Sequence, residues 1–131
     1  MLESAQQKIR DGKRGADLRF GHDGNLIPLA GLLNLENCYG SEADPYKLHE
    51  VYADFKIAPM AGNVQLVFFR PKDVKKQSAD GSDVLVKFML NEREVHVDAL
   101  DTDNFPFYRW PDVENYWTSL LSQPLPEPLV D

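Results

Sequence analysis

The sequence of 131 residues has one cysteine, no long apolar run and fewer basic than acidic residues. A single cysteine, Cys38, excludes an internal disulfide and cannot form a metal site alone, so we expect a buried or idle thiol. No segment approaches the roughly 18 consecutive apolar residues of a membrane span. Residues 2–8 contain no apolar core, so the sequence predicts no secretion signal in this chain.

The charge balance is acidic, with 14 Lys and Arg against 21 Asp and Glu and a net charge of -7. This excludes general nucleic-acid binding, because affinity for the phosphate backbone comes from clustered basic residues. With 43% hydrophobic and 27% charged residues, the chain is expected to fold as one domain or as part of a larger one. Its basic residues gather near the N-terminus, either as a solvated surface or as a positive rim beside the turn described next: Lys8, Arg10, Lys13, Arg14 and Arg19.

Residues 16–25 are the stretch around which the chain is expected to be organised. Ala16, Leu18 and Phe20 alternate with polar residues, which predicts a β-strand over residues 16–21. A polar turn with His22 and Asp23 follows, before an apolar run that predicts a helix. Strand, turn and helix start together form a place where a helix N-terminus can hold an anion.

The helix is predicted over residues 26–35, with Asn25 as its N-cap and Pro28 in its first turn, where a missing N–H costs little. It is apolar on nearly all sides, which predicts burial within a larger protein body. We therefore expect this chain to be part of a longer protein.

The other elements follow from their periodicity. Helices are predicted over residues 2–12, ending near Gly12, over a weaker stripe at 48–55, and from Pro111 to Leu121. Residues 63–70 predict a central strand, apolar on both faces. Residues 83–90 predict a second strand, which turns at 91–92 into 94–97 as a hairpin. The tail, 122–131, is rich in proline and is expected to be extended.

The chemistry that the sequence offers lies at His22 and Asp23. An imidazole can bind an anion, and a carboxyl group can deliver a proton when burial or a neighbouring negative charge, such as a bound phosphate, keeps it protonated. Two interpretations stay open from the residues alone. The pair either acts on a phosphate, or Asp23 and Asn25 merely cap the helix while His22 bonds to the backbone.

The run Gly21-His22-Asp23-Gly24-Asn25-Leu26 resembles the second motif of the histidine acid phosphatases, which include the phytases and the multiple inositol-polyphosphate phosphatases. That motif is usually His-Asp-Thr-Asn before an apolar helix. The likeness continues through residues 58–61, the strand at 63–70, the strands around 91–95 and the aromatic segment before the last helix. It covers roughly residues 17–121.

The resemblance implies the C-terminal part of a phosphoglycerate-mutase-like, three-layer α/β/α fold and the hydrolysis of phosphomonoesters through a phosphohistidine. In similar enzymes the histidine at the position of His22 binds the transferred phosphoryl group, and the aspartate at that of Asp23 protonates the leaving oxygen. Arg19 and Asn25 are the further substrate-binding candidates. The resemblance implies neither a metal nor an organic cofactor. Inositol phosphates are the substrates to test first, and periplasmic or secreted parent proteins are expected.

Two departures qualify the resemblance. Gly24 stands where the family usually has threonine, so a hydroxyl contact is missing. The nucleophile motif, Arg-His-Gly-x-Arg-x-Pro, does not occur in this chain. We therefore expect a C-terminal portion that supplies the acid half of an active site, needs the N-terminal remainder as a partner and is inactive alone. Apolar surfaces exposed in such a portion favour self-association.

Other functions are less well supported by the sequence. A metal hydrolase lacks ligands at suitable spacing among His22, Asp23, His49, Glu50 and His96. No Gly-x-Ser-x-Gly motif indicates a serine nucleophile. The main alternative is a non-catalytic module that binds a partner through the aromatic segment 105–110 and the exposed face of the hairpin, although aromatic residues at this density more often pack a core.

Overall fold

The computed structural model describes residues 1–124 as a mixed α/β arrangement around a four-stranded sheet. The strands are β1 (Val64–Phe69), β2 (Leu85–Leu90), β3 (Arg93–Glu94) and β4 (Phe107–Arg109). The helices are α1 (Leu2–Asp11), α2 (Asp23–Leu32), α3 (Leu48–Val51), α4 (Asp54–Ile57), the 3-10 turn η1 (Val74–Lys76) and α5 (Trp110–Ser122). None of the helices in this part of the chain has the length and apolar character needed to cross a membrane.

The sheet is antiparallel, and β2 is its central strand. It pairs with β1 along one side, as Val64 opposite Leu90 through Phe69 opposite Leu85, and with β3 and β4 along the other. The prediction of β1 as a central strand is therefore wrong, because among the strands of residues 1–124 β1 pairs with β2 alone. The face of β1 opposite the core is apolar because Phe69 packs edge-on against Phe107 of β4 on that side of the sheet.

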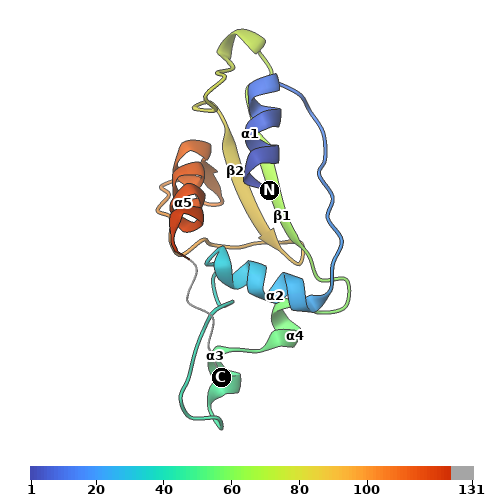
Figure 1. Cartoon of the computed structure of the whole chain (residues 1–131), viewed down its shortest axis with the longest axis vertical. Helices are drawn as coiled ribbons and strands as arrows, with labels where there is room; N and C mark the ends of the chain where they lie inside the picture. Colours follow the sequence, from blue (N-terminus) through green and yellow to red (C-terminus); the bar gives the residue numbers. More distant parts are fainter. Residues whose placement is uncertain (125–131) are drawn as a thin grey trace.

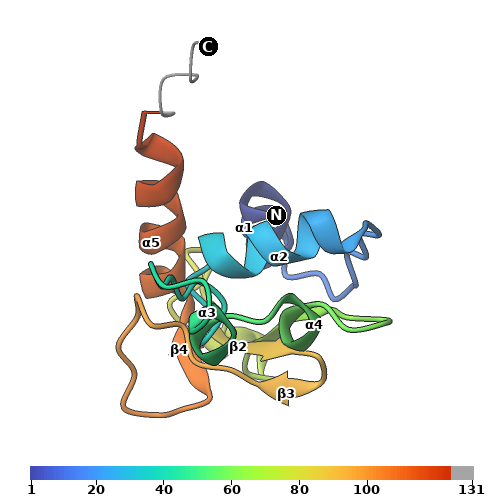
Figure 2. The ribbon, with the colours of Figure 1, turned by 90° about the horizontal axis from the view of Figure 1, so that it is seen from below.

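One face of the sheet carries the core. Helices α1, α2 and α5 lie on this side of the sheet (Figures 1 and 2). Phe88 of β2 meets both Tyr108 and Trp117 at nearly perpendicular ring planes, and Trp110 packs against Phe68 and Trp117. Aromatic rings bury large apolar areas in this way, so they dominate the stabilisation of a small domain.

Several predicted elements are confirmed. Helix α1 ends at a left-handed Gly12, α5 begins one residue before Pro111, and β1 and β2 fall within their predicted ranges. The hairpin is also confirmed: Asn91 and Glu92 both have positive φ and join β2 to β3. However, β3 stops at Glu94, and the predicted stripe at 48–55 is divided between α3 and α4. Residues 125–131 of the predicted tail lie outside the described part of the chain.

The strand predicted over residues 16–21 is not formed. These residues run extended along the outside from α1 to α2 (Figure 1), and Leu18 and Phe20 are 75% and 94% exposed. The alternation of apolar and polar residues is typical of a strand, but a strand also needs a hydrogen-bonded neighbour. No neighbour is present within residues 1–124.

Helix α2 begins earlier than predicted. His22, and not Asn25, is its N-cap, and Pro28 lies inside the helix at its sixth residue. Because Asp23 is favoured in the first turn by the helix dipole, the helix can start there. Pro28 then has no N–H to donate to the carbonyl of Gly24. Within residues 1–124, Ala30 is the buried residue of α2, and Leu33 and Leu35 of the predicted helix are buried as well, but Leu32 is 59% exposed. The predicted burial on nearly all sides is therefore achieved only in part.

Arg70, directly after β1, forms bonds that join β1 to α1 and to the loop before β2. Its Nε lies 3.1 Å from Oδ2 of Asp83, and its Nη1 and Nη2 donate to the carbonyl oxygens of Ile9 and Ser78, each at 2.9 Å. The two side chains of the ion pair are only 19% and 9% exposed. The pair therefore joins segments that are far apart in the sequence.

This ion pair predicts a loss of stability in acid. Burial raises the pKa of Asp83, but the hydrogen bonds from Arg70 and from the N–H of Ser78 outweigh it and hold the pKa below its usual value. Asp80, bonded to Ser78 and Ser82, has a pKa of about 2. A depressed pKa contributes stability above the unfolded value of about 3.9, which is lost as the pH falls through the folded value. The free energy of unfolding in urea, measured about every half pH unit between pH 5 and pH 2, should fall with the pH. The fall should be shallower for Asp83→Asn, which has no carboxylate at this position to protonate. Equal slopes would contradict the assignment.

Candidate functional site

His22 stands at the start of α2, where the extended segment enters the helix. Its backbone is extended (φ −96°, ψ 170°), and its carbonyl accepts from the N–H groups of Asn25 and Leu26 at 2.9 and 3.1 Å. The imidazole makes no capping bond and is exposed. The ring is therefore accessible to a ligand from solvent.

Asp23 is the first residue of α2, and its carboxylate is exposed. Oδ1 accepts a hydrogen bond from the N–H of Gly24 at 2.7 Å. The carboxylate therefore satisfies one of the N–H groups that a helix leaves unpaired in its first turn. This agrees in part with the capping interpretation of the sequence, although the side chain of His22 forms no hydrogen bond within residues 1–124.

Asn25 and Arg19 are placed differently. Asn25 lies in the same turn as His22 and Asp23, and its side chain folds back over Gly21, where a β-carbon would come within 2.9 Å of Nδ2. Arg19 is held by Asp17, with 3.3 Å between Nη2 and Oδ2. Asp17 also accepts from the hydroxyl of Ser4 at 2.7 Å, and these hydrogen bonds from Ser4 and Arg19 lower its pKa. The structure thus brings three of the predicted site residues into one turn and holds the fourth at Asp17.

The turn is open to solvent. Every residue from 10 to 25 is exposed. On its other side α2 contacts α4, and a β-carbon on Gly62 would lie 3.1 Å from Leu26, so the helix start sits beside the connection 58–62 (Figures 1 and 2). A phosphate bound at this turn would therefore stay exposed to solvent unless further protein enclosed it.

The predicted positive rim is partly neutralised. Arg19 pairs with Asp17, and Lys13 lies 3.4 Å from Asp11. Both pairs are largely exposed, so each contributes little to stability. Among the basic residues of this segment, Lys8 is half-buried and the others are exposed.

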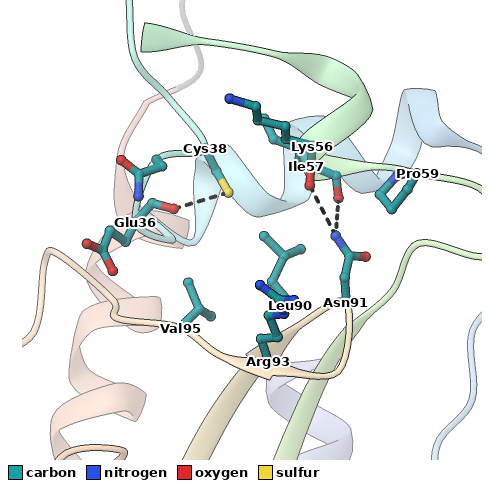
Figure 3. Close-up of a pocket in the computed structure, with 10 residues that line it drawn as sticks. Glu36, Cys38, Lys56, Ile57, Pro59, Leu90, Asn91, Arg93 and Val95 are labelled. Carbon is teal, nitrogen blue, oxygen red and sulfur yellow. Dashed lines mark hydrogen bonds between the residues drawn. The ribbon is translucent and has the colours of Figure 1, made fainter. Parts of the chain in front are cut away.

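A pocket of about 470 Å³ lies elsewhere, between the β2–β3 hairpin, the end of α4 and the loop at residues 36–38 (Figure 3). The amide of Asn91 donates to the carbonyls of Lys56 and Ile57 at 3.3 and 3.0 Å and so closes one end. Lys56 and Arg93 line it, and neither forms an ion pair within the described residues. No pattern in the sequence indicates this pocket. The turn at Asn91 was visible in the sequence, but its contact with α4 was not.

Cys38 lines the same pocket and is buried, which confirms the expectation of a buried thiol. Its Sγ lies 3.5 Å from the carbonyl oxygen of Glu36. Burial, with a smaller effect of the charge on Asp98, raises the pKa of the thiol. The thiol is therefore a poor nucleophile at neutral pH, because the thiolate is the reactive form.

A second pocket, of about 540 Å³, is lined by His49 and Glu50 of α3 together with Tyr39 and Asp98. Tyr39 donates its hydroxyl to Asp98. Across residues 1–124, no three His, Cys, Asp or Glu side chains lie close enough to hold a metal ion. The side chains considered for a metal hydrolase are therefore not assembled in this part of the chain.

The aromatic segment 105–110 mostly packs the core. Tyr108 and Trp110 are each 1% exposed, and the hydroxyl of Tyr108 accepts from the buried N–H of Val97 at 3.0 Å. Phe105 stays exposed and stacks on His96, with 3.8 Å between the ring centres. The aromatic surface expected for a partner-binding module is thus largely inside the protein.

Neither the scan against models of protein families nor the search of curated proteins finds a match to this chain.

Proposed function

We propose that this chain is the C-terminal part of a histidine phosphatase of three-layer α/β/α fold that hydrolyses phosphomonoesters, and that it supplies the acid half of the active site. One observation carries the proposal. His22 and Asp23 lie side by side in sequence at the exposed start of a ten-residue helix, after an extended segment, with the imidazole unbonded in the described chain. The helix start after His22 supports the proposal, although the strand predicted before it is not formed within the described residues.

In the proposed reaction, a histidine on the N-terminal remainder attacks phosphorus and displaces the alcohol. The P–O bond to the alcohol breaks, and Asp23 gives its proton to the leaving oxygen. The Asp23 carboxylate then accepts a proton from the water that attacks the phosphohistidine, which releases phosphate and restores both groups. Splitting the displacement in this way replaces one difficult step by two easier ones.

Each of the other residues at the turn has a part in the proposal. His22 hydrogen-bonds the transferred phosphoryl group, and the positive end of α2 favours its charge. Asn25, which folds back over Gly21, and Arg19 contact the substrate. No metal or organic cofactor takes part in this scheme. Inositol phosphates are the proposed substrate class, and a periplasmic or secreted parent protein is proposed.

The exposure of α2 supports the existence of further protein. Within the described residues, Ala30 is buried and Ile27 and Leu29 pack against the core, but Leu32 leaves 59% of its surface in water. Covering apolar surface yields about 25 cal/mol for each Å² removed from water. A remainder that packs on α2 would therefore be stabilised, and would enclose the turn at His22.

The proposal predicts that the purified 131-residue chain has no phosphatase activity. Release of inorganic phosphate from inositol hexakisphosphate would stay at background, because no nucleophile motif is present. Fusion to an upstream segment that carries Arg-His-Gly-x-Arg-x-Pro should restore turnover and allow a phosphohistidine to be trapped by acid-free quenching. Turnover by the chain alone, or a fusion that folds and forms no phosphohistidine, would overturn the proposal.

A further inference from the structure

The segment between α1 and α2 has a free backbone. Within the described chain, no backbone N–H or C=O of residues 14–21 takes part in a hydrogen bond. The segment runs extended and clear of the sheet (Figure 1). A row of unpaired N–H and C=O groups in an extended chain is a template on which another strand can add.

The side chains of the segment alternate as they do in a strand, but the apolar ones face water. Leu18 and Phe20 are 75% and 94% exposed. On the opposite side, Asp17 is bonded to Ser4 of α1 and to Arg19. The segment therefore presents its apolar side chains to solvent, and Asp17 on the other side ties it to α1.

The order of the charged residues in the segment favours a second copy of this chain as the partner strand. If two copies of the segment pair antiparallel with Leu18 on the two-fold axis, Asp17 of each copy lies opposite Arg19 of the other. Moving the axis by one residue places Asp17 opposite Asp17, or Arg19 opposite Arg19. Opposite charges in facing positions stabilise a strand pair, and like charges destabilise it. Only the register centred on Leu18 places both charges opposite charges of the other sign. In this register Arg19 exchanges its exposed contact with Asp17 of its own copy for Asp17 of the second copy.

The same register matches the remaining positions. Ala16 lies opposite Phe20 of the second copy, a small side chain against a large one, beside the two Leu18 side chains. The backbone of His22 is already extended (φ −96°, ψ 170°), so the strand can continue to that residue.

From these observations we infer that the 131-residue chain forms a two-fold dimer in which residues 14–22 of two copies pair as antiparallel strands centred on Leu18. The apolar residues of the two segments then lie on one common face. Arg14 of one copy comes to lie opposite His22 of the other, so each copy adds positive charge at the other's candidate site. This inference stands on the pairing pattern and does not depend on phosphatase activity.

The test is sedimentation velocity of the purified chain over a range of concentrations. The native chain should show a concentration-dependent dimer. Asp17→Arg and Arg19→Asp should each raise the dissociation constant about tenfold or more, because each change creates two like-charge pairs by symmetry. An equimolar mixture of the two variants should dimerise again, since every facing pair is then opposite in charge. Asp103→Arg, at an exposed residue outside the segment, is the matched control and should leave the dimer unchanged.

A cross-link determines the register independently. Leu18→Cys should form a disulfide-linked dimer under mild oxidation, because residue 18 faces itself across the axis, whereas Ala16→Cys should not. The native Cys38 is buried and should not contribute. The inference would be overturned if the native chain is monomeric at its highest soluble concentration. It would also be overturned if neither charge change weakens the dimer, or if the mixture of the two variants stays monomeric.

Discussion

Replacing Asp23 by asparagine in the fusion that carries the nucleophile should lower kcat for an alkyl phosphate by about 10²- to 10⁴-fold. Asparagine keeps the size and polarity of the side chain but cannot give a proton to the leaving oxygen. An alkoxide is a poor leaving group and needs that proton. The measurement is steady-state release of inorganic phosphate from an inositol phosphate.

The leaving group provides an internal control for this prediction. A nitrophenolate leaves readily without a proton, so the same variant should lose far less activity toward p-nitrophenyl phosphate. Asp112→Asn is the matched control in the chain, because Asp112 is an exposed carboxylate in the first turn of α5, as Asp23 is in α2. It should retain full activity on both substrates. A uniform loss on both substrates for Asp23→Asn would contradict the role of Asp23 as proton donor.

Replacing Gly81 by alanine should destabilise the fold by about 2–4 kcal/mol. Gly81 has φ +73°, a left-handed conformation that costs an alanine free energy. Its added β-carbon would also lie 2.5 Å from Cδ1 of Trp110 and 3.2 Å from Cγ2 of Ile9. Both neighbours belong to the core, so they cannot move away cheaply. The loss of unfolding free energy is measured by urea titration, with tryptophan fluorescence as the signal.

Alanine substitutions at two other glycines distinguish the free-energy cost of a positive φ from that of the contact with Trp110. Gly12 has φ +63°, but a β-carbon there would meet only Oε1 of Gln77 at 3.8 Å. Gly12→Ala should therefore cost about 1 kcal/mol, the backbone contribution alone. Gly24 lies in α2 with nothing within 4 Å, so Gly24→Ala should not destabilise the fold. Equal losses at Gly81 and Gly12 would show that contact with Trp110 is not the cause.

The elements that sequence reasoning located are those whose pattern is local. The stripe of Val113 and Trp117 in α5, and the alternation in β2, can be read without knowledge of the partner element. The extended segment shows the limit of such patterns. Ala16, Leu18 and Phe20 have the period of a strand, but whether a strand forms depends on a neighbour that the local sequence does not specify.

The candidate site was predictable to the same extent. His22 and Asp23 beside the start of a helix are a local feature, and the structure has it. The helix begins at Asp23 and not at Leu26 as predicted. The attachment of Arg19 to Asp17, and of Asp17 to Ser4, was not predicted because it requires α1 to lie beside the segment. The pocket beside Asn91 was missed for the same reason, since residues 36–38, 56–59 and 90–95 meet only in the folded chain.

The most direct test of the proposed function is to read the coding DNA upstream of the codon for Met1. The proposal predicts that the reading frame continues upstream and encodes Arg-His-Gly-x-Arg-x-Pro, which would supply the nucleophile and give Asp23 its role as acid. A stop codon in frame just upstream, with a genuine start at Met1, would contradict it, because the chain would then have no nucleophile for His22 and Asp23 to assist.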